Sequence, residues 1–410
     1  MMSVKSIRNI ILCFSLCIAL VIPINVVSAQ EMPVHSTNQW TRQSPYESLE
    51  KPGIKWSVEL GSYVTNLVID SDGIIYVVSG WGAAKLSAIS PAGKLLWQKK
   101  VNGGSTDLTL YQDSSLLLLG YATGNEDEAA VLYSFSKKGD LNWENRFPNL
   151  GSYYQGGVGV DDDGFITLAG EVDSKSGMTI HLIGVGQDGT TKWRTELNKP
   201  FERATSSSPI IVKGNIYITY GKGIVKKVSK SSSRTEFKSG YLAKVNKEGR
   251  ILWTKSYDGY NFAEPVYTNN TLYVQADDDI NLFDLNGTLK KSIVPVKNKA
   301  SNTLIAPSIS DDGTIIFGHR AYSPSGRMLW SFSNFDIRTS VDFPNNMVTI
   351  DSKQNILYDY GKVLYSANLK TKKINWKLPL YQKIFSPSTI GRDGTVYIGG
   401  ETKLFAIGNK

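Results

Sequence analysis

Short runs in which apolar and polar residues alternate fill the chain from about residue 53 to its end. In each repeat of the pattern, a β-branched run, a turn rich in Asp, Asn and Gly, and a second apolar run follow one another. Examples are LVIDSDGIIYVV at 67–78, VGVDDDGFITLA at 158–169 and TIGRDGTVYIG at 389–399. Such turns are typical of hairpins, because Gly tolerates the positive φ that a tight turn needs. No window of helical length beyond the N-terminal apolar stretch has a 3.6-residue apolar period, so the sequence predicts an all-β fold.

Seven of the nine tryptophans occur in the same setting, in a fourth strand that follows a Gly turn. Five of them end a Gly-x-x-x-Trp run, and two stand in looser copies of it. The seven are Trp56, Trp97, Trp143, Trp193, Trp253, Trp330 and Trp376. An eighth copy, Gly287 to Lys291, keeps the Gly and has Lys in place of Trp. Four strands in each period of this length are typical of one blade of a β-propeller.

The counts of strands predict how the ring closes. Eight Trp-type strands match eight sets of three other strands only if the N-terminal strand at 54–60 joins the blade built by residues 385–408. Such closure leaves no sheet edge unpaired around the ring. We expect one domain at 53–410, an all-β, eight-bladed β-propeller with four antiparallel strands per blade. Each Trp should wedge between neighbouring blades, and the joint that holds Lys291 should be the weakest.

The first 29 residues have the features of a secretory signal peptide. Lys5 and Arg8 precede an apolar stretch at 10–22, and the residues VSA at 27–29 fit a cleavage site after Ala29. The stretch is shorter than the roughly 20 apolar residues that cross a bilayer, which disfavours the alternative of a transmembrane helix. We therefore expect a secreted protein.

Both cysteines of the chain, Cys13 and Cys17, lie in this segment. Each follows a Leu and not the small residue that precedes a lipid-modified Cys, so no stable membrane anchor is expected. Without the segment the chain contains no Cys, which excludes disulfides, thiolate nucleophiles and Cys-ligated metals. Residues 30–52 are expected to form a polar leader ahead of the propeller.

The positive charge is concentrated in one segment. The formal net charge is +8, and the signal peptide contributes two of its 45 basic residues, but the segment 222–238 alone holds six against Glu236. The six are Lys222, Lys226, Lys227, Lys230, Arg234 and Lys238. Nucleic-acid surfaces interleave such residues with stacking aromatics, and the segment has only Phe237, so direct DNA binding is not expected. The segment is a candidate interaction loop, as is the acidic run at 125–128, and solvated loops without function are the plain alternative.

No pattern in the sequence assigns a catalytic, cofactor-binding or metal site. The histidines, His35, His181 and His319, lack the spacing of a zinc site, and there is no Gly-x-Ser-x-Gly elbow. Three acidic clusters precede Gly in hairpins, so turn formation explains them better than Ca²⁺ binding. They lie at 70–72, 161–163 and 311–312. A fourth cluster, at 277–279, follows its hairpin and is the exception to watch.

The run from Ala88 to Trp97, A-x-x-x-x-G-x-x-x-W, resembles the pyrroloquinoline-quinone-like (PQQ-like) repeat, and about eight copies cover nearly all of the chain after the signal. The copies depart from the family where an Asp is common three residues before the Gly. Only Asp284 keeps it, and the others have Ser90, Ser136, Gly186, Asn246 and Ser323. Within the family the chain looks most like the secreted single-propeller proteins of bacilli, of the YxaL type.

The family contains both enzymes and binding proteins, so the fold alone does not choose a function. Its dehydrogenases hold the quinone over Ca²⁺, in many cases beside a vicinal disulfide that this chain cannot form. Its outer-membrane assembly lipoproteins need a lipid-modified Cys that is absent here. The resemblance implies a monomeric, non-enzymatic platform without cofactor that binds an unidentified protein and modulates a partner enzyme, such as a helicase, without touching DNA. The alternatives are a PQQ- and Ca²⁺-dependent dehydrogenase and a binder of cell-wall glycan.

Overall fold

The structure is a computed structural model that describes residues 42–410, apart from 81, 113–114, 123–128, 152–156, 228–232, 260–262, 278, 295–305, 318–319 and 332–347. The chain divides into two compact units, Met1–Glu31 and Met32–Lys410, and every described residue belongs to the second. The predicted signal peptide, His35, His319, Lys230 and the acidic run at 125–128 lie outside the described residues. In the described part of the chain, no helix is both long enough and apolar enough to span a membrane.

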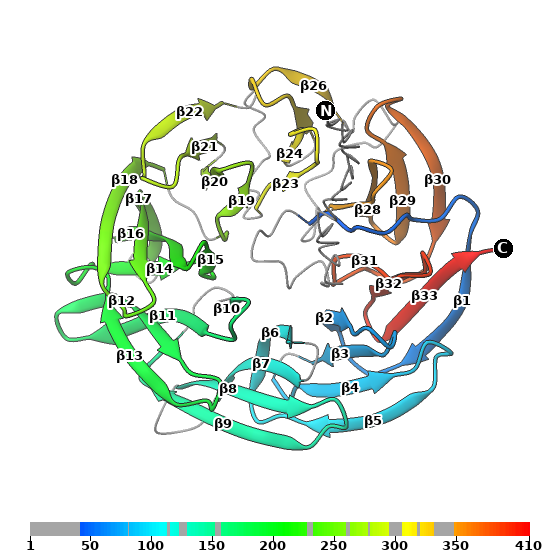
Figure 1. Ribbon diagram of the computed structural model, residues 1–410, viewed down its shortest axis with the longest axis horizontal. Helices are drawn as coiled ribbons and strands as arrows, with labels where there is room; N and C mark the ends of the chain where they lie inside the picture. The colour runs from blue at the N-terminus through cyan, green and yellow to red at the C-terminus, as the bar shows by residue number, and fades with distance from the viewer. Residues whose placement is uncertain are drawn as a thin grey trace, which may run out of the picture. The chain divides into compact units, whose positions relative to one another are not determined.

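The described residues form eight antiparallel sheets arranged around a ring, as predicted (Figure 1). The strands below are given from the ring centre outward. Blade 1 holds β2 (Val64–Ile69), β3 (Ile75–Ser79), β4 (Lys85–Ile89) and β5 (Leu95–Lys100). Blade 2 holds β6 (Gly104–Tyr111), β7 (Ser115–Ala122), β8 (Ala129–Ser136) and β9 (Leu141–Pro148). Blade 3 holds β10 (Val158–Val160), β11 (Ile166–Ser174), β12 (Gly177–Val185) and β13 (Thr191–Glu196).

The next blades continue the order. Blade 4 holds β14 (Arg203–Ser206), β15 (Ile210–Val212), β16 (Asn215–Lys227), β17 (Ser233–Asn246) and β18 (Ile251–Asp258). Blade 5 holds β19 (Val266–Thr268), β20 (Thr271–Ala276), β21 (Asp279–Phe283) and β22 (Leu289–Ile293). Blade 6 holds β23 (Ser308–Ile309), β24 (Ile315–Phe317), β25 (Arg320–Tyr322) and β26 (Met328–Ser331). Blade 7 holds β27 (Thr349–Ile350), β28 (Asn355–Tyr360), β29 (Val363–Asn368) and β30 (Lys373–Pro379).

Blade 8 closes the ring with strands from both ends of the chain. It holds β31 (Thr389–Ile390), β32 (Val396–Gly399), β33 (Lys403–Asn409) and, outermost, β1 (Pro52–Glu59). The pairing of β1 with β33 is antiparallel and runs from Pro52 opposite Asn409 to Glu59 opposite Lys403. The predicted sharing of one sheet by the two ends is therefore confirmed.

Blade 4 departs from the four-stranded plan because its inner strand is interrupted. Two short segments, β14 and β15, both pair with β16, and residues 207–209 separate them. Pro209 ends this gap, and a proline has no N–H to give to the ladder. The interruption leaves three consecutive serines, Ser206 to Ser208, buried at the inner end of the blade.

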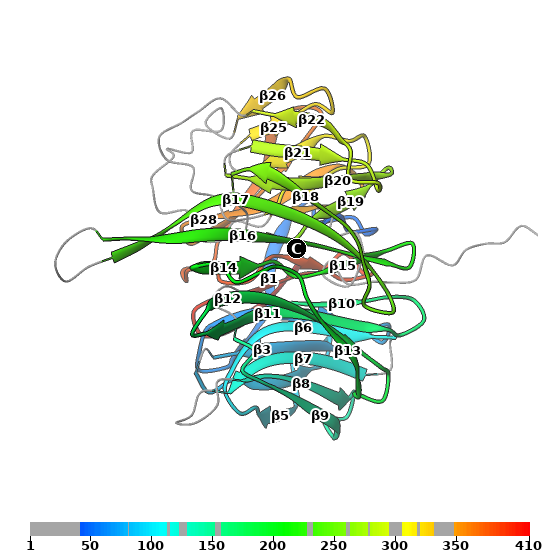
Figure 2. The same cartoon turned by 90° about the vertical axis from the view of Figure 1, so that its left-hand side faces the viewer.

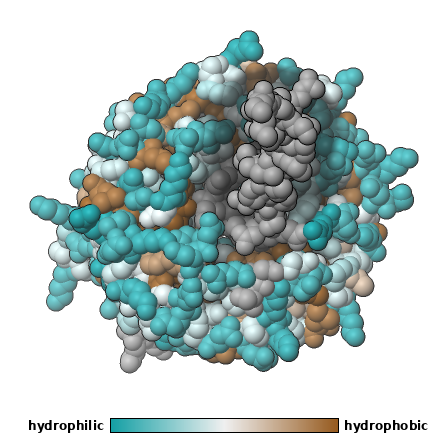
Figure 3. Space-filling view, in the orientation of Figure 1, coloured by the Kyte–Doolittle hydropathy of each residue, from teal (hydrophilic) through white to brown (hydrophobic). Residues whose placement is uncertain are grey.

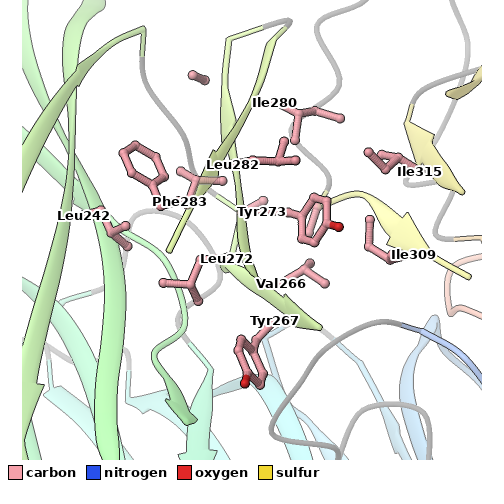
Figure 4. Close-up of a cluster of buried hydrophobic side chains, with 14 of the residues drawn as sticks. Leu242, Val266, Tyr267, Leu272, Tyr273, Ile280, Leu282, Phe283, Ile309 and Ile315 are labelled. Atoms are coloured by element: carbon pink, nitrogen blue, oxygen red, sulfur yellow. The ribbon is translucent and has the colours of Figure 1, made fainter. Parts of the chain in front are cut away.

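The core lies between the blades, where the second and third strands of one sheet pack on those of the next. The largest cluster joins blades 4, 5 and 6 through aliphatic and aromatic side chains (Figure 4). It includes Leu242 of β17, Leu272 of β20 and Ile315 of β24, each fully buried. The outer strands are mostly exposed, and hydrophilic side chains dominate the surface in the view of Figure 1 (Figure 3). Apolar burial between sheets thus holds the ring in shape.

The two faces of the ring are built differently. At one face, here called the turn face, first strands turn into second strands and third strands into fourth strands. At the other, the connection face, second strands join third strands and each blade joins the next. The hairpin of β16 and β17 belongs to the connection face and projects beyond the other strands (Figure 2).

Candidate functional site

The predicted Trp residues lie at the joints between blades. At the joint of blades 1 and 2, the indole of Trp97 covers Gly139, where an added Cβ would stand 2.9 Å from indole carbon Cδ2. Gly139 has a φ of 86°, in the left-handed region that favours glycine. The same contact pairs Trp56 with Gly93, Trp143 with Gly189, Trp193 with Gly249 and Trp253 with Gly287. The Gly of each repeat is therefore the contact surface for the Trp of the preceding blade.

Polar contacts reinforce these joints on the turn face. Trp97 donates its indole N–H to the carbonyl oxygen of Lys137 at 3.0 Å, and the ammonium of Lys137 lies 3.0 Å from the carboxylate of Asp70 in blade 1. The pair Lys247 and Asp163 joins blades 4 and 3 in the same way, at 2.6 Å. The equivalent indole bonds run from Trp56 to Pro91, from Trp143 to Gln187 and from Trp193 to Lys247. Trp and Asp of one blade thus contact a single turn of the next.

The remaining joints are variations on this contact. Trp376 is buried and donates to the carbonyl oxygen of Leu49, just before β1, at 2.6 Å. Trp330 is buried against Ile350 of blade 7. Lys291 is exposed and donates from Nζ to the carbonyl oxygen of Ser325, so an ammonium replaces the indole N–H. The joint at Lys291 therefore keeps the polar bond and lacks the ring.

The segment at 222–238, predicted as a loop, is instead a two-stranded ribbon, and the loop prediction is wrong in this respect. We call residues 222–227 and 233–239 the basic ribbon. Its last four ladder pairs run from Ile224 opposite Glu236 to Lys227 opposite Ser233. Pairing with β14 stops at Gly223 and pairing with β18 stops at Gly240, so no third strand among the described residues covers these four pairs. The adjacent β-branched residues Ile224 and Val225 favour the extended backbone of a strand.

Ion pairs within the ribbon use part of its charge. Lys226 and Lys238 both contact the carboxylate of Glu236, and hydrogen bonds from Lys226 and then Lys238 lower the pKa of Glu236 to about 2. The Nζ of Lys222 lies 5.4 Å above the ring of Phe201, a cation–π contact. Lys227 is exposed, and the side chains of Lys230 and Arg234 lie outside the described residues. The available positive charge is therefore smaller than the sequence indicates.

The two sides of the ribbon differ in chemistry. Residues that face each other in an antiparallel ladder point to the same side. Val225 and Thr235 share one side, where Phe237 packs over Gly223, and an added Cβ on Gly223 would lie 3.0 Å from the Phe237 ring. The other side carries the ion pairs of Glu236. The ribbon therefore offers an apolar patch, Val225 and Phe237, on the side that also carries Lys227, and the ion pairs of Glu236 on the side that carries Ile224.

Charged side chains also meet at the ring centre, where the sequence predicted no site. The guanidinium of Arg42 is 2% exposed. It lies 2.8 Å from Oε1 of Glu264, before β19, and donates to the carbonyl oxygen of Ala306, before β23, at 2.9 Å. A buried guanidinium requires a carboxylate partner, and this contact ties the segment ahead of β1 to blades 5 and 6.

A second carboxylate of the ring centre belongs to Asp107 in β6. It accepts hydrogen bonds from the N–H of Val158 at 3.0 Å and from Nδ2 of Asn66 at 3.1 Å. Burial raises the pKa of Asp107 to about 6, against the lowering effect of the Val158 bond and with a further rise from the carboxylate of Glu264. Asp107 lies within inner strand β6, and Glu264 lies two residues before inner strand β19. A charged residue directly before a short apolar run is the sequence signal that could have found them.

The other described residues that the sequence singled out lie in turns or in partly buried contacts within the blades. The carboxylate of Asp70 accepts from the N–H groups of Asp72 and Ile74 in its own turn, as turn formation predicts. Asp277 has a φ of 52° in the turn between β20 and β21. Burial and then the charge of Arg194 lower the pKa of His181 to about 4. Within the described ranges, no group of three or more His, Cys, Asp or Glu side chains could hold a metal ion.

Comparison with known proteins supports the fold. A family model described as outer membrane protein assembly factor BamB matches residues 37–239. BamB from Moraxella catarrhalis has a similar structure, with a TM-score of 0.56 at 12% identity over 87% of this chain and 99% of that one. A europium-containing methanol dehydrogenase is similar with a TM-score of 0.62 at 11% identity, over 93% and 98% of the two chains. No curated protein sequence matches. The chain is an eight-bladed β-propeller built from repeats of the PQQ-like family.

Proposed function

We propose that this protein is a secreted, non-enzymatic propeller that binds a partner protein through its connection face, with the basic ribbon as the main contact. The observation that carries the proposal is the projection of four ladder pairs beyond any third strand of the described chain. A ribbon with two open edges can pair with another chain, so proteins usually shorten or cover such edges. Its apolar patch and its ion pairs would add specificity to that contact.

The family description adds a second line of support. The matching family model is described as an outer membrane protein assembly factor, and such a factor acts by contact with other proteins. By this likeness the propeller would act as an accessory to a larger partner, and modulation of an enzyme such as a helicase belongs to the same proposal. Secretion, with cleavage after Ala29, rests on the residues of the first 29 positions, and the YxaL-type likeness rests on the signal, the length and the number of blades.

The main alternative, a dehydrogenase with quinone and Ca²⁺ at the ring centre, does not fit the residues found there. Glu264 is paired with Arg42, and the carboxylate of Asp107 is already bonded to Val158 and Asn66. A cation-binding site needs several free oxygen ligands that converge on one point. The guanidinium of Arg42 already supplies a positive charge beside Glu264.

Replacement of the ribbon tests the proposal. Lys222 and Ser239 face each other across the ladder, so Asn-Gly can replace residues 223–238 as a two-residue hairpin turn. The tagged, unaltered protein is expected to capture a defined protein from culture medium, and the shortened protein should retain less than a tenth of it. Mass spectrometry of the captured material is the measurement.

A matched control removes a side chain from another hairpin of the connection face. Lys175 is exposed in the turn between β11 and β12, and Lys175→Ser should leave capture unchanged. Equal capture by the shortened and unaltered proteins would reject the ribbon as the binding site. Saturable quenching of Trp fluorescence by quinone together with Ca²⁺ would instead support the dehydrogenase alternative.

A further inference from the structure

Residues 42–51, here called the N-terminal arm, lie against the inner edge of blade 7 in the manner of a bound peptide. The N–H of Ser44 donates to the carbonyl oxygen of Ile350 at 2.7 Å, and the N–H of Ile350 donates to that of Arg42 at 3.0 Å. Gln43 and Ile350 form a parallel bridge. Gln43 thus adds to the free edge of β27, and the arm runs outward from the ring centre to β1 (Figure 1). Peptides recognised by strand addition obtain affinity from such main-chain bonds.

Side chains of the arm contact blades 5, 6 and 7. Arg42 reaches Glu264 and Ala306, on blades 5 and 6, and its guanidinium is almost fully buried. Two nitrogens of one guanidinium satisfy a carboxylate and a backbone carbonyl at once, which an ammonium cannot do with the same geometry. The first recognition element of the arm is therefore an arginine.

Two further elements follow in the arm. The N–H and the hydroxyl of Ser48 both donate to Oδ2 of Asp351, at 3.0 and 2.6 Å, and Asp351 is fully buried. Leu49 is 5% exposed and packs with Trp376 and Leu380 of blade 7. Main-chain pairing and these spaced side-chain contacts act together. They favour an extended segment in which an Arg comes six residues before a Ser-Leu pair.

The ring centre is acidic without Arg42. Glu264 would then lose its ion-pair partner, and the second carboxylate, Asp107, is buried close enough for the charge of Glu264 to affect its pKa. A carboxylate buried without a partner is destabilising, so a cation is favoured there. The chain supplies that cation from its own arm.

We propose that the inner edge of β27, together with Glu264 and the carbonyl of Ala306, is a binding site for an extended, arginine-bearing polypeptide of a partner protein. The N-terminal arm occupies this site in cis and must leave before the partner enters. The site is separate from the basic ribbon and goes beyond the function proposed above. The arm competes at an effective concentration on the order of millimolar, so a free peptide binds only when the hold of the arm is weakened.

A synthetic peptide with the sequence of residues 41–51, TRQSPYESLEK, is the probe. Its fluorescence anisotropy is measured with the full chain and with the full chain carrying Arg42→Ala. We expect the variant to bind the peptide at least ten times more tightly than the unaltered chain. A peptide with Ala in place of its Arg should bind the variant at least ten times more weakly than the original peptide.

Cooperative unfolding will show that Arg42→Ala is folded. If the folded variant binds the two peptides equally, or binds neither, the proposal is overturned. Where Arg42→Ala does not fold, Arg42→Lys keeps a positive charge and loses the two-nitrogen contact, and the same preference for the Arg peptide is expected. A Lys variant that binds neither peptide would also overturn it. The protein with the shortened ribbon and Arg42→Ala should keep peptide binding, so the two proposals fail separately.

Discussion

The turn face and the connection face are made by the same repeat, yet only the turn face is alike from blade to blade. At the turn face, Gly93 and Gly139 each donate an N–H to the carbonyl three residues earlier, at 2.9 Å, and each carries the indole of the neighbouring blade. At the connection face, the join of β5 to β6 takes three residues, whereas the hairpin of β16 and β17 extends into the basic ribbon. The Trp–Gly joints that reinforce the ring therefore occupy one face, whereas the connections on the other face vary in length.

The largest expected effect concerns a turn-face joint. Trp97→Ala should lower the free energy of unfolding by about 3–5 kcal/mol, because it removes a large apolar contact and leaves a cavity against Gly139. Lys291→Ala, at the joint without an indole, should cost less than about 1 kcal/mol, since an exposed ammonium contributes little. Urea unfolding at one pH measures both.

Equal losses in the two variants would show that the indoles are not what holds the turn face. Lys291→Trp supplies a gain-of-function control, because an indole there should raise the free energy of unfolding. Ile293 already lies near Gly326, with an added Cβ 3.2 Å from its Cγ1, so the gain should be smaller than the loss in Trp97→Ala.

The turn face was predictable from sequence because its contacts are local and repeat. A Gly four residues before a Trp defines both the turn and the contact surface for the indole of the preceding blade. The pairing of β1 with β33 was predicted from the number of strands alone, without any knowledge of their contacts. The predicted loop at 222–238 was wrong because its many lysines and serines drew attention away from the β-branched pair Ile224 and Val225, through which β16 continues.

The ring centre was not predictable from local patterns. Arg42 meets Glu264 at a distance of 222 residues along the chain, and no repeat marks either of them. Its position depends on how the arm pairs with Ile350, which is a property of the closed ring. The leader was expected to be polar, yet its described part buries Arg42, Ser44 and Leu49.

The second largest expected effect is on how stability depends on pH, compared between the ring centre and the turn face. The pKa of Asp107 is raised to about 6 in the folded state, so the folded protein binds this proton more tightly than the unfolded chain does. Its contribution favours folding below about pH 4 and is lost as the pH rises through 6. A shift of about two pKa units corresponds to at most about 3 kcal/mol. Asp107→Asn should remove this loss, as measured by urea unfolding from pH 4 to 7.

A turn-face carboxylate should behave in the opposite way. Hydrogen bonds from Asp161 and from Lys247 lower the pKa of Asp163 to about 2. The stabilisation by Asp163 is therefore present above about pH 4 and lost as the pH falls through 2. Asp163→Asn should leave the slope between pH 4 and 7 unchanged, and a change there equal to that of Asp107→Asn would contradict the assignment of the slope to the ring centre.

The smallest expected effect on stability concerns the charge of the connection face. Glu236→Gln releases Lys226 and Lys238 from their ion pairs, and exposed pairs of this kind contribute less than about 1 kcal/mol. The free energy of unfolding should therefore barely change, while the protein should elute from a heparin column at higher salt. Glu248→Gln makes the same change of charge at an exposed turn-face position, next to Gly249. It should shift elution less, because no lysines are released there. Equal shifts would mean that the positive charge is spread over both faces and that the ribbon has no special affinity for acidic partners.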